Sequence, residues 1–175
     1  MIVVIAIIAI LTAIITPNAF MAIEKAKVTR VIADMKVMGK AAIAYGADVG
    51  FFPPDIPQGV DPGFMKALPY DIHTGAEVDP DPAFVAIALS PNWKDIVNAR
   101  WNGPYLEKYP LSHPWGGNYD YDYWIRGITH PLNPGLYIGL RSLPTSVMEK
   151  LNQLEGFASL GAGWTDQTEY LINPL

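Results

Sequence analysis

The sequence contains no cysteine, no charged residue before Glu24 and no excess of basic residues. The absence of cysteine excludes disulfide bonds, thiolate metal sites and thiol nucleophiles, so stability must come from packing. The net charge of -5 provides no basic surface of the kind that neutralises phosphates. We therefore expect no nucleic-acid partner.

The absence of early charge leaves a long apolar segment at the start of the chain. Residues 1–16 contain only two polar side chains, Thr12 and Thr16, and both hydroxyls can bond a backbone carbonyl within a helix. At 1.5 Å per residue this segment spans about 24 Å, less than the roughly 30 Å of a hydrocarbon core. No basic residue precedes it and residues 17–20 form a poor cleavage context, which disfavours a cleaved signal peptide. We favour a membrane anchor over a cleaved signal or the buried helix of a soluble domain.

The helical pattern continues beyond Pro17, which is expected to kink the helix rather than end it. Between Phe20 and Tyr45 apolar residues recur every three to five positions and form one helical stripe. Charged residues occupy the other face, where Lys36 and Lys40 either pair with another subunit or face solvent. We expect these residues of the stripe to lie under a globular head: Val28, Val31, Ile32, Met35, Met38 and Tyr45.

The sequence after Tyr45 is rich in turns and predicts short elements. Asp81 and Pro82 are typical of a helix start and predict a helix over 82–88, and a second short helix is predicted over 93–99. Ser146 and Glu149 have the spacing of a capping box, which predicts a helix over 147–154.

Tyrosine and aspartate alternate from Tyr119 to Tyr123, which predicts a strand with the tyrosines packed on one face. We expect Asp120 and Asp122 to form the solvated face. Residues 135–141 predict the second strand of an antiparallel hairpin.

Together these elements predict an α+β fold, in which a long kinked N-terminal helix packs as a stalk on a small antiparallel head with short helices and long loops. The predicted parts are a hydrophobic anchor over 1–23, an amphipathic half of the helix over 24–46 and a globular head over 47–175.

The stretches IVVIAIIAILTAIITPNAF, AKVTRVIADMKVMGKAAIAY and FFPPD cover roughly the first 55 residues. They resemble the N-terminal region of type IV pilins and type II secretion pseudopilins. Residues 101–106 and 113–119 are similar to the W-x-G-P-Y-L and D-P-W-G-x-x-Y segments of the major pseudopilin, although His113 replaces the aspartate. This resemblance favours the secretion branch of the family.

The resemblance implies a structural subunit that is held in the bacterial inner membrane by one span, with its head in the periplasm. It further implies assembly into a homo-oligomeric helical filament, either a periplasmic pseudopilus or an extracellular pilus, by an inner-membrane platform. In the family the apolar half exchanges membrane lipid for the packed filament core. The residues assigned to anchor and core in this way are Ile2, Val3, Val4, Ile5, Ile7, Ile8, Ile10, Leu11, Ile14, Ile15 and Pro17.

The start of the sequence differs from the family pattern. Family members begin with Phe-Thr-Leu-Ile-Glu after a prepilin peptidase removes a basic leader, and the new first residue is methylated. We therefore expect that Met1 is an internal methionine and that a leader and five further residues precede it in the natural protein. Lys25, Lys27 and Arg30 taken alone would place the head in the cytoplasm, so the expected topology depends on the resemblance.

An alternative is a minor pilin or a membrane-tethered envelope protein that displays its head as an adhesin or a cargo reader. We expect no enzymatic activity. His73, His113 and His130 lie in separate loops without ligand spacing, and Ser112 is not part of a G-x-S-x-G motif.

We expect neither a metal site nor a cofactor. Residues 159–163 with Asp166 are faintly similar to the calcium-binding loop of the family, so calcium is a weakly supported alternative. Asp166 and Glu169 supply too few carboxylates for the six to eight oxygens that calcium takes.

Overall fold

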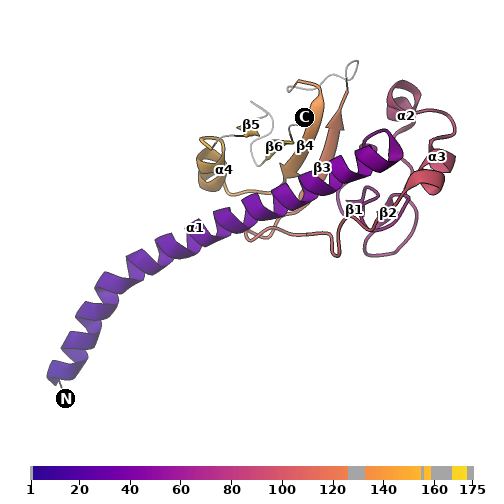
Figure 1. The fold of residues 1–175 in the computed structure, drawn as a ribbon. Helices are drawn as coiled ribbons and strands as arrows, with labels where there is room; N and C mark the ends of the chain where they lie inside the picture. The colour runs from indigo at the N-terminus through magenta and orange to yellow at the C-terminus, as the bar shows by residue number, and fades with distance from the viewer. Residues whose placement is uncertain (1, 126–132, 155, 159–166, 173–175) are drawn as a thin grey trace.

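The computed structural model describes residues 2–125, 133–154, 156–158 and 167–172, and a single long helix dominates it (Figure 1). This helix, α1, spans Ile2–Val49. Its second half lies along the head, whereas its first half extends away from the head to the N-terminus (Figure 1). The coarse α+β layout is as predicted, with a long N-terminal helix and small antiparallel sheets.

Helix α1 passes through Pro17 without ending. Proline removes one backbone hydrogen bond, but helix-forming residues follow it at once. Figure 1 shows the helix bending in the half that extends from the head. At its other end α1 continues past residue 46 to Val49, whose side chain is fully buried, and Gly50 terminates it with a φ of 96°.

The head is built on a four-stranded antiparallel sheet in the order β3-β4-β6-β5. The predicted hairpin is confirmed: β3 (Tyr119–Trp124) pairs with β4 (Gly135–Leu140), and Tyr121 lies opposite Ile138. β6 (Thr168–Ile172) pairs with the other edge of β4, and β5 (Phe157–Ala158) lies outside β6.

A second, two-stranded sheet joins β1 (Val60–Asp61) to β2 (Tyr70–Asp71). The sequence pattern predicted none of β1, β2, β5 and β6. β1, β2 and β5 have two residues each, which is too short for an alternating pattern to be recognised.

The short helices follow the sequence pattern only in part. α2 (Pro82–Ala88) is as predicted, because Asp81 Oδ1 accepts a 2.6 Å hydrogen bond from Ala83 N. α3 (Trp93–Arg100) is one residue longer than predicted. The predicted capping box is wrong: α4 spans Thr145–Leu151, and its N-cap is Pro144, which makes no side-chain hydrogen bond.

The core lies between α1 and one face of the sheet. Val31, Met35 and Met38 of α1 are fully buried there, and Tyr121 of β3 is almost so. Tyr45 of α1 is fully buried in a second cluster, which it forms with residues of α3. Val28 and Ile32 are half-buried at the sides of this stripe. The tyrosines of β3 therefore pack as predicted, towards the helix.

The aspartates on the other face of β3 are not solvated, and this prediction was wrong. Asp120 and Asp122 are only 6% and 4% exposed. The strand register places Asp120 opposite Gly139, which in turn lies opposite Glu169 on β6. Arg141, directly after β4, donates hydrogen bonds to both aspartates. The alternating pattern predicted that water would solvate these carboxylates, whereas in the structure they are paired with this buried cation.

Candidate functional site

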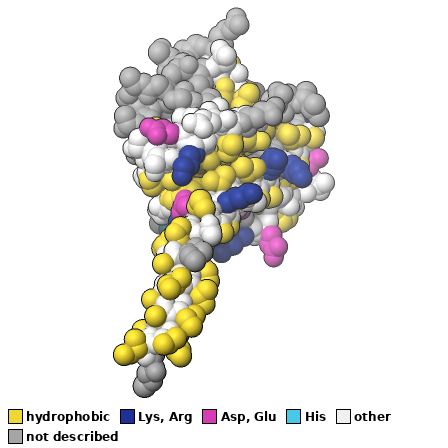
Figure 2. Space-filling view, turned by 90° about the vertical axis from the view of Figure 1, so that its left-hand side faces the viewer, with side chains coloured by type: hydrophobic (Ala, Val, Ile, Leu, Met, Phe, Trp, Pro, Cys, Tyr) yellow, Lys and Arg dark blue, Asp and Glu magenta, His cyan; other side chains and the backbone are white. Residues whose placement is uncertain are grey.

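The first half of α1 exposes its apolar side chains, which range from 52% exposed at Ile7 to 85% at Ile2. Pro17 is exposed as well, and the side chain of Ile14 lies outside the described part. Figure 2 shows this segment as an almost continuous apolar surface below the head. The described side chains of the predicted anchor that are exposed in this way are Ile2, Val3, Val4, Ile5, Ile7, Ile8, Ile10, Leu11 and Ile15.

The polar groups of this segment are satisfied internally. Thr12 Oγ1 donates to Ile8 O at 2.8 Å, and Thr16 Oγ1 donates to Thr12 O at 2.6 Å. Both bonds are as predicted, and they remove the cost of placing a free hydroxyl in lipid.

The uncharged length of α1 is greater than the apolar run before Pro17 suggested. Because the helix continues through Pro17, its charge-free part extends from Ile2 to Ile23, about 33 Å at 1.5 Å per residue. This matches a hydrocarbon core of about 30 Å. Among the described residues, α1 is the one helix that is long and apolar enough to cross a membrane.

The second half of α1 is fastened to the head by polar contacts at successive levels. Trp115 Nε1 donates to Glu24 Oε2 at 3.2 Å, and Tyr119 OH donates to Asp34 Oδ2 at 2.8 Å. Further along, Tyr105 OH donates to Asp48 Oδ2 at 2.9 Å. The buried stripe and these contacts together hold the helix along the length of the head.

Two segments of the head supply these contacts, residues 101–106 and 113–119, the segments that resemble the major pseudopilin. Trp101 Nε1 donates to Gly63 O at 2.8 Å, and Tyr105 packs edge-on against Tyr45 of α1 with ring centroids 6.0 Å apart. Their aromatic residues therefore serve to attach loops to each other and to α1.

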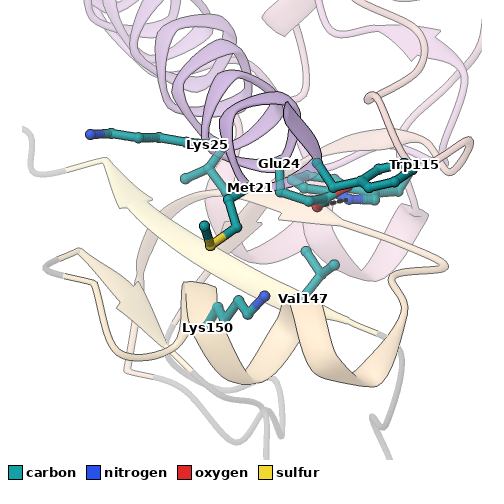
Figure 3. Close-up of a pocket in the computed structure, with 8 residues that line it drawn as sticks. Met21, Glu24, Lys25, Trp115, Val147 and Lys150 are labelled. Carbon is teal, nitrogen blue, oxygen red and sulfur yellow. Dashed lines mark hydrogen bonds between the residues drawn. The ribbon is translucent and has the colours of Figure 1, made fainter. Parts of the chain in front are cut away.

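An open groove of about 360 Å³ lies where α1 leaves the head. Figure 3 shows Met21 reaching from α1 towards α4, with Val147 and Lys150 facing it and the Trp115–Glu24 hydrogen bond at one side. The groove is lined by Phe20, Met21, Glu24, Lys25, Val28, Trp115, Val147 and Lys150.

Three carboxylates surround one guanidinium on the sheet face opposite α1. Arg141 Nη2 lies 2.8 Å from Asp120 Oδ2, 3.2 Å from Asp122 Oδ1 and 3.9 Å from Glu169 Oε1. Glu169 is fully buried, and neither of its carboxyl oxygens has a hydrogen-bond partner among the residues that the structure describes. We call these four residues the buried acidic cluster.

Burial disfavours the charged form of every acid in this cluster. It raises the pKa of Glu169 from 4.5 to about 8 and that of Asp120 from 3.8 to about 6, against the opposing effect of Arg141. The pKa of Asp122 is raised too, by burial and then by the charge of Glu169. Asp55, which accepts a 3.2 Å hydrogen bond from Tyr123 N, has its pKa raised to about 6 by burial. The cluster therefore retains a proton near neutral pH.

The structure describes two of the three histidines that were considered as weak site candidates, and they lie in different surroundings. His73 is exposed, whereas His113 is buried, with Nε2 at 2.8 Å from Arg141 O and Nδ1 accepting from Trp115 N at 3.3 Å. Burial lowers the pKa of His113, so it holds a turn as a neutral residue. His130, Asp166 and the calcium-like loop over 159–163 lie outside the described residues.

The described part of the chain contains no group of three His, Asp or Glu residues arranged to hold a metal ion. In the buried acidic cluster the cation is the chain's own Arg141. Sequence reasoning missed this residue, because nothing in its sequence surroundings distinguishes a buried arginine at the end of a strand from a surface one.

The chain matches no protein-family model, no curated protein and no solved structure. The structural features above are therefore the basis for the functional conclusion.

Proposed function

We propose that this protein is a membrane-anchored structural subunit of a helical filament of the type IV pilus class, most similar to a type II secretion pseudopilin. The observation that carries the proposal is the division of α1. One half of a continuous helix supplies the core of the head, and the other half is apolar, uncharged, exposed and long enough to cross a bilayer.

An exposed apolar surface of this extent is unfavourable in water and requires a lipid or protein environment. A bilayer satisfies it before assembly. In a filament the same side chains pack against the helices of neighbouring copies, and no charge has to be desolvated between Ile2 and Ile23. Assembly then exchanges lipid contacts for helix-helix contacts, driven by an inner-membrane platform after a prepilin peptidase has processed a longer precursor.

The test is the variant Ile8→Arg, expressed from the natural gene. An arginine at this depth costs about 3 kcal/mol in a bilayer and would lie unpaired in a filament core. We expect loss of the filaments seen by electron microscopy. Ile87→Arg is the matched control, since Ile87 is 56% exposed on α2, outside the anchor. Normal filaments from Ile8→Arg would refute the proposal.

The same micrographs separate the proposed subunit from the alternative of a minor pilin or tethered binding protein. A subunit of this class gives a regular helical repeat. A tethered receptor remains monomeric in the membrane or occupies only a filament tip, and this outcome would replace the proposed function with the alternative.

A further inference from the structure

The groove at the exit of α1 continues the apolar surface of the anchor. Phe20 and Met21, at its lower edge, are 64% and 65% exposed and belong to the charge-free part of the helix. Val28 and Val147 extend the apolar lining upwards into the head. Its volume of about 360 Å³ falls within the range of about 300–1,000 Å³ that is usual for small-molecule sites.

The charges at the groove have an excess of positive sign. Glu24 is engaged by Lys27 Nζ at 2.8 Å and by the indole of Trp115. Lys25 and Lys150 are exposed and form no ion pair with any residue that the structure describes. Figure 3 shows Lys25 extending outwards from α1, with its ammonium group directed away from the groove, and Lys150 below Met21 with its ammonium group directed into it. The charge of Lys150 helps to lower the pKa of Glu24, after the hydrogen bonds from Lys27 and Trp115.

We propose that this groove binds an anionic phospholipid, with its phosphate held by Lys150 and by Lys25, whose exposed side chain turns towards it on binding, and with one acyl chain along Phe20, Met21 and Val147. The proposal depends on the membrane anchoring proposed above. If residues 2–23 cross the bilayer, the next turn of α1 lies among the headgroups, where lysines meet lipid phosphates. Trp115 then occupies the interfacial level that tryptophan prefers.

Charge favours a lipid over a second copy of this chain as the occupant. The apolar half of another α1 carries no acidic side chain before Glu24, so it would place no negative group opposite Lys25 and Lys150. An anionic lipid supplies both the apolar chain and the negative charge. Each lysine near such a lipid is expected to favour it over a neutral one by about fivefold.

The test uses the full chain in phosphatidylcholine vesicles that contain a small fraction of brominated phosphatidylglycerol or brominated phosphatidylcholine. Bromine on the acyl chain quenches nearby tryptophans, and the difference between wild type and Trp115→Phe isolates the signal of Trp115. The double variant Lys25→Gln/Lys150→Gln removes the proposed phosphate contacts. The matched control is Lys36→Gln/Lys40→Gln, which removes the same charge higher on α1.

We expect stronger quenching of Trp115 by the brominated anionic lipid than by the neutral one, at least fivefold in apparent affinity. This preference should disappear in Lys25→Gln/Lys150→Gln and persist in the control. Equal quenching by both lipids in wild type, or equal loss in both double variants, would overturn the proposal.

Two further outcomes would also overturn it, for distinguishable reasons. Quenching that is equal for both lipids and rises only on dilution of the protein in the bilayer would show a second copy in the groove. Failure of the wild type to float with vesicles of either composition would overturn the anchoring itself. Normal flotation without lipid preference leaves the anchoring intact and refutes only the lipid site.

Discussion

The indole Nε1 of Trp115 donates a 3.2 Å hydrogen bond to Glu24 Oε2, joining residues that lie 91 positions apart in the chain. Glu24 is the first charged residue of the sequence, so this contact marks the level at which α1 leaves the head. The loop before β3 is therefore fixed to the boundary between the apolar and amphipathic halves of the helix.

The substitution Trp115→Phe should lower the free energy of unfolding by about 1–2 kcal/mol, because it removes this hydrogen bond to a charged acceptor. Denaturant unfolding of the full chain in detergent measures the change. A double-mutant cycle with Glu24→Ala should give a coupling energy of about 1 kcal/mol. Strictly additive effects would show that the contact contributes nothing to stability.

The buried acidic cluster predicts a dependence of stability on pH. The pKa of Glu169 is raised in the folded state, from 4.5 to about 8, so the folded state binds this proton more tightly than the unfolded state. The stability that protonated Glu169 contributes is therefore complete below pH 4.5, and it is lost as the pH rises through about 8. Because the pKa of Asp120 is raised from 3.8 to about 6, its contribution to stability also decreases as the pH rises over this range.

We expect a loss of several kcal/mol, up to about 5 kcal/mol from Glu169 alone, as the pH rises from 4.5 to about 8, since each unit between the two pKa values is worth about 1.4 kcal/mol. Denaturation midpoints at several pH values measure it. Glu169→Gln, which cannot ionise, should flatten the dependence, whereas Glu149→Gln on the exposed face of α4 should leave it unchanged. A wild-type stability that increases up to pH 8 would contradict the assignment.

Replacement of Arg141 by methionine should lower the free energy of unfolding by about 3–5 kcal/mol, because the carboxylates of Asp120 and Asp122 lose a buried cation. The loss should be smaller at low pH, where these acids are protonated. The triple variant Asp120→Asn/Asp122→Asn/Arg141→Met should recover part of the stability. If the single variant is as stable as wild type at neutral pH, the ion pairs do not support the head.

Gly117→Ala should be strongly destabilising, by about 2 kcal/mol or more, because an added Cβ would collide with Arg141 O and approach His113 Nε2 to 2.5 Å. Thermal unfolding of the variant tests this. Gly59→Ala is the control for backbone strain alone, since Gly59 has a φ of 78° and open space around it. It should cost only about 1 kcal/mol. Equal losses of stability in the two variants would mean that the steric collision at Gly117 does not determine the effect of its substitution.

The sequence predicted the parts of the fold that depend on local patterns. The stripe from Val28 to Tyr45, the hairpin of β3 and β4, and the Asp81 cap of α2 all arise from periodicity or from contacts between near neighbours. The capping box at Ser146 failed because α4 begins at Thr145 with Pro144 as its N-cap, two positions earlier than a cap at Ser146 would require.

The candidate site was less predictable, because its contacts join distant segments. A period of two identifies Asp120 and Asp122 as neighbours on one face, but it cannot show that Arg141 and Glu169 bury that face. Likewise the groove combines α1 with Trp115 and α4, which approach one another only in the folded head. The length of about 24 Å counted only residues 1–16, whereas the predicted anchor over 1–23 and the predicted continuation of the helix through Pro17 agree with the observed helix.

The continuity of α1 also determines how the molecule would respond to mechanical load. A pull along the anchor meets no joint between the anchor and the head, because one helical backbone belongs to both. The bonds to Trp115, Tyr119 and Tyr105 connect the helix to the head at successive heights, so tension along the axis acts on them as shear. Bonds loaded in shear share the force and fail together, whereas bonds that open in sequence fail one at a time. The head is thus attached in a way that suits a tensile element.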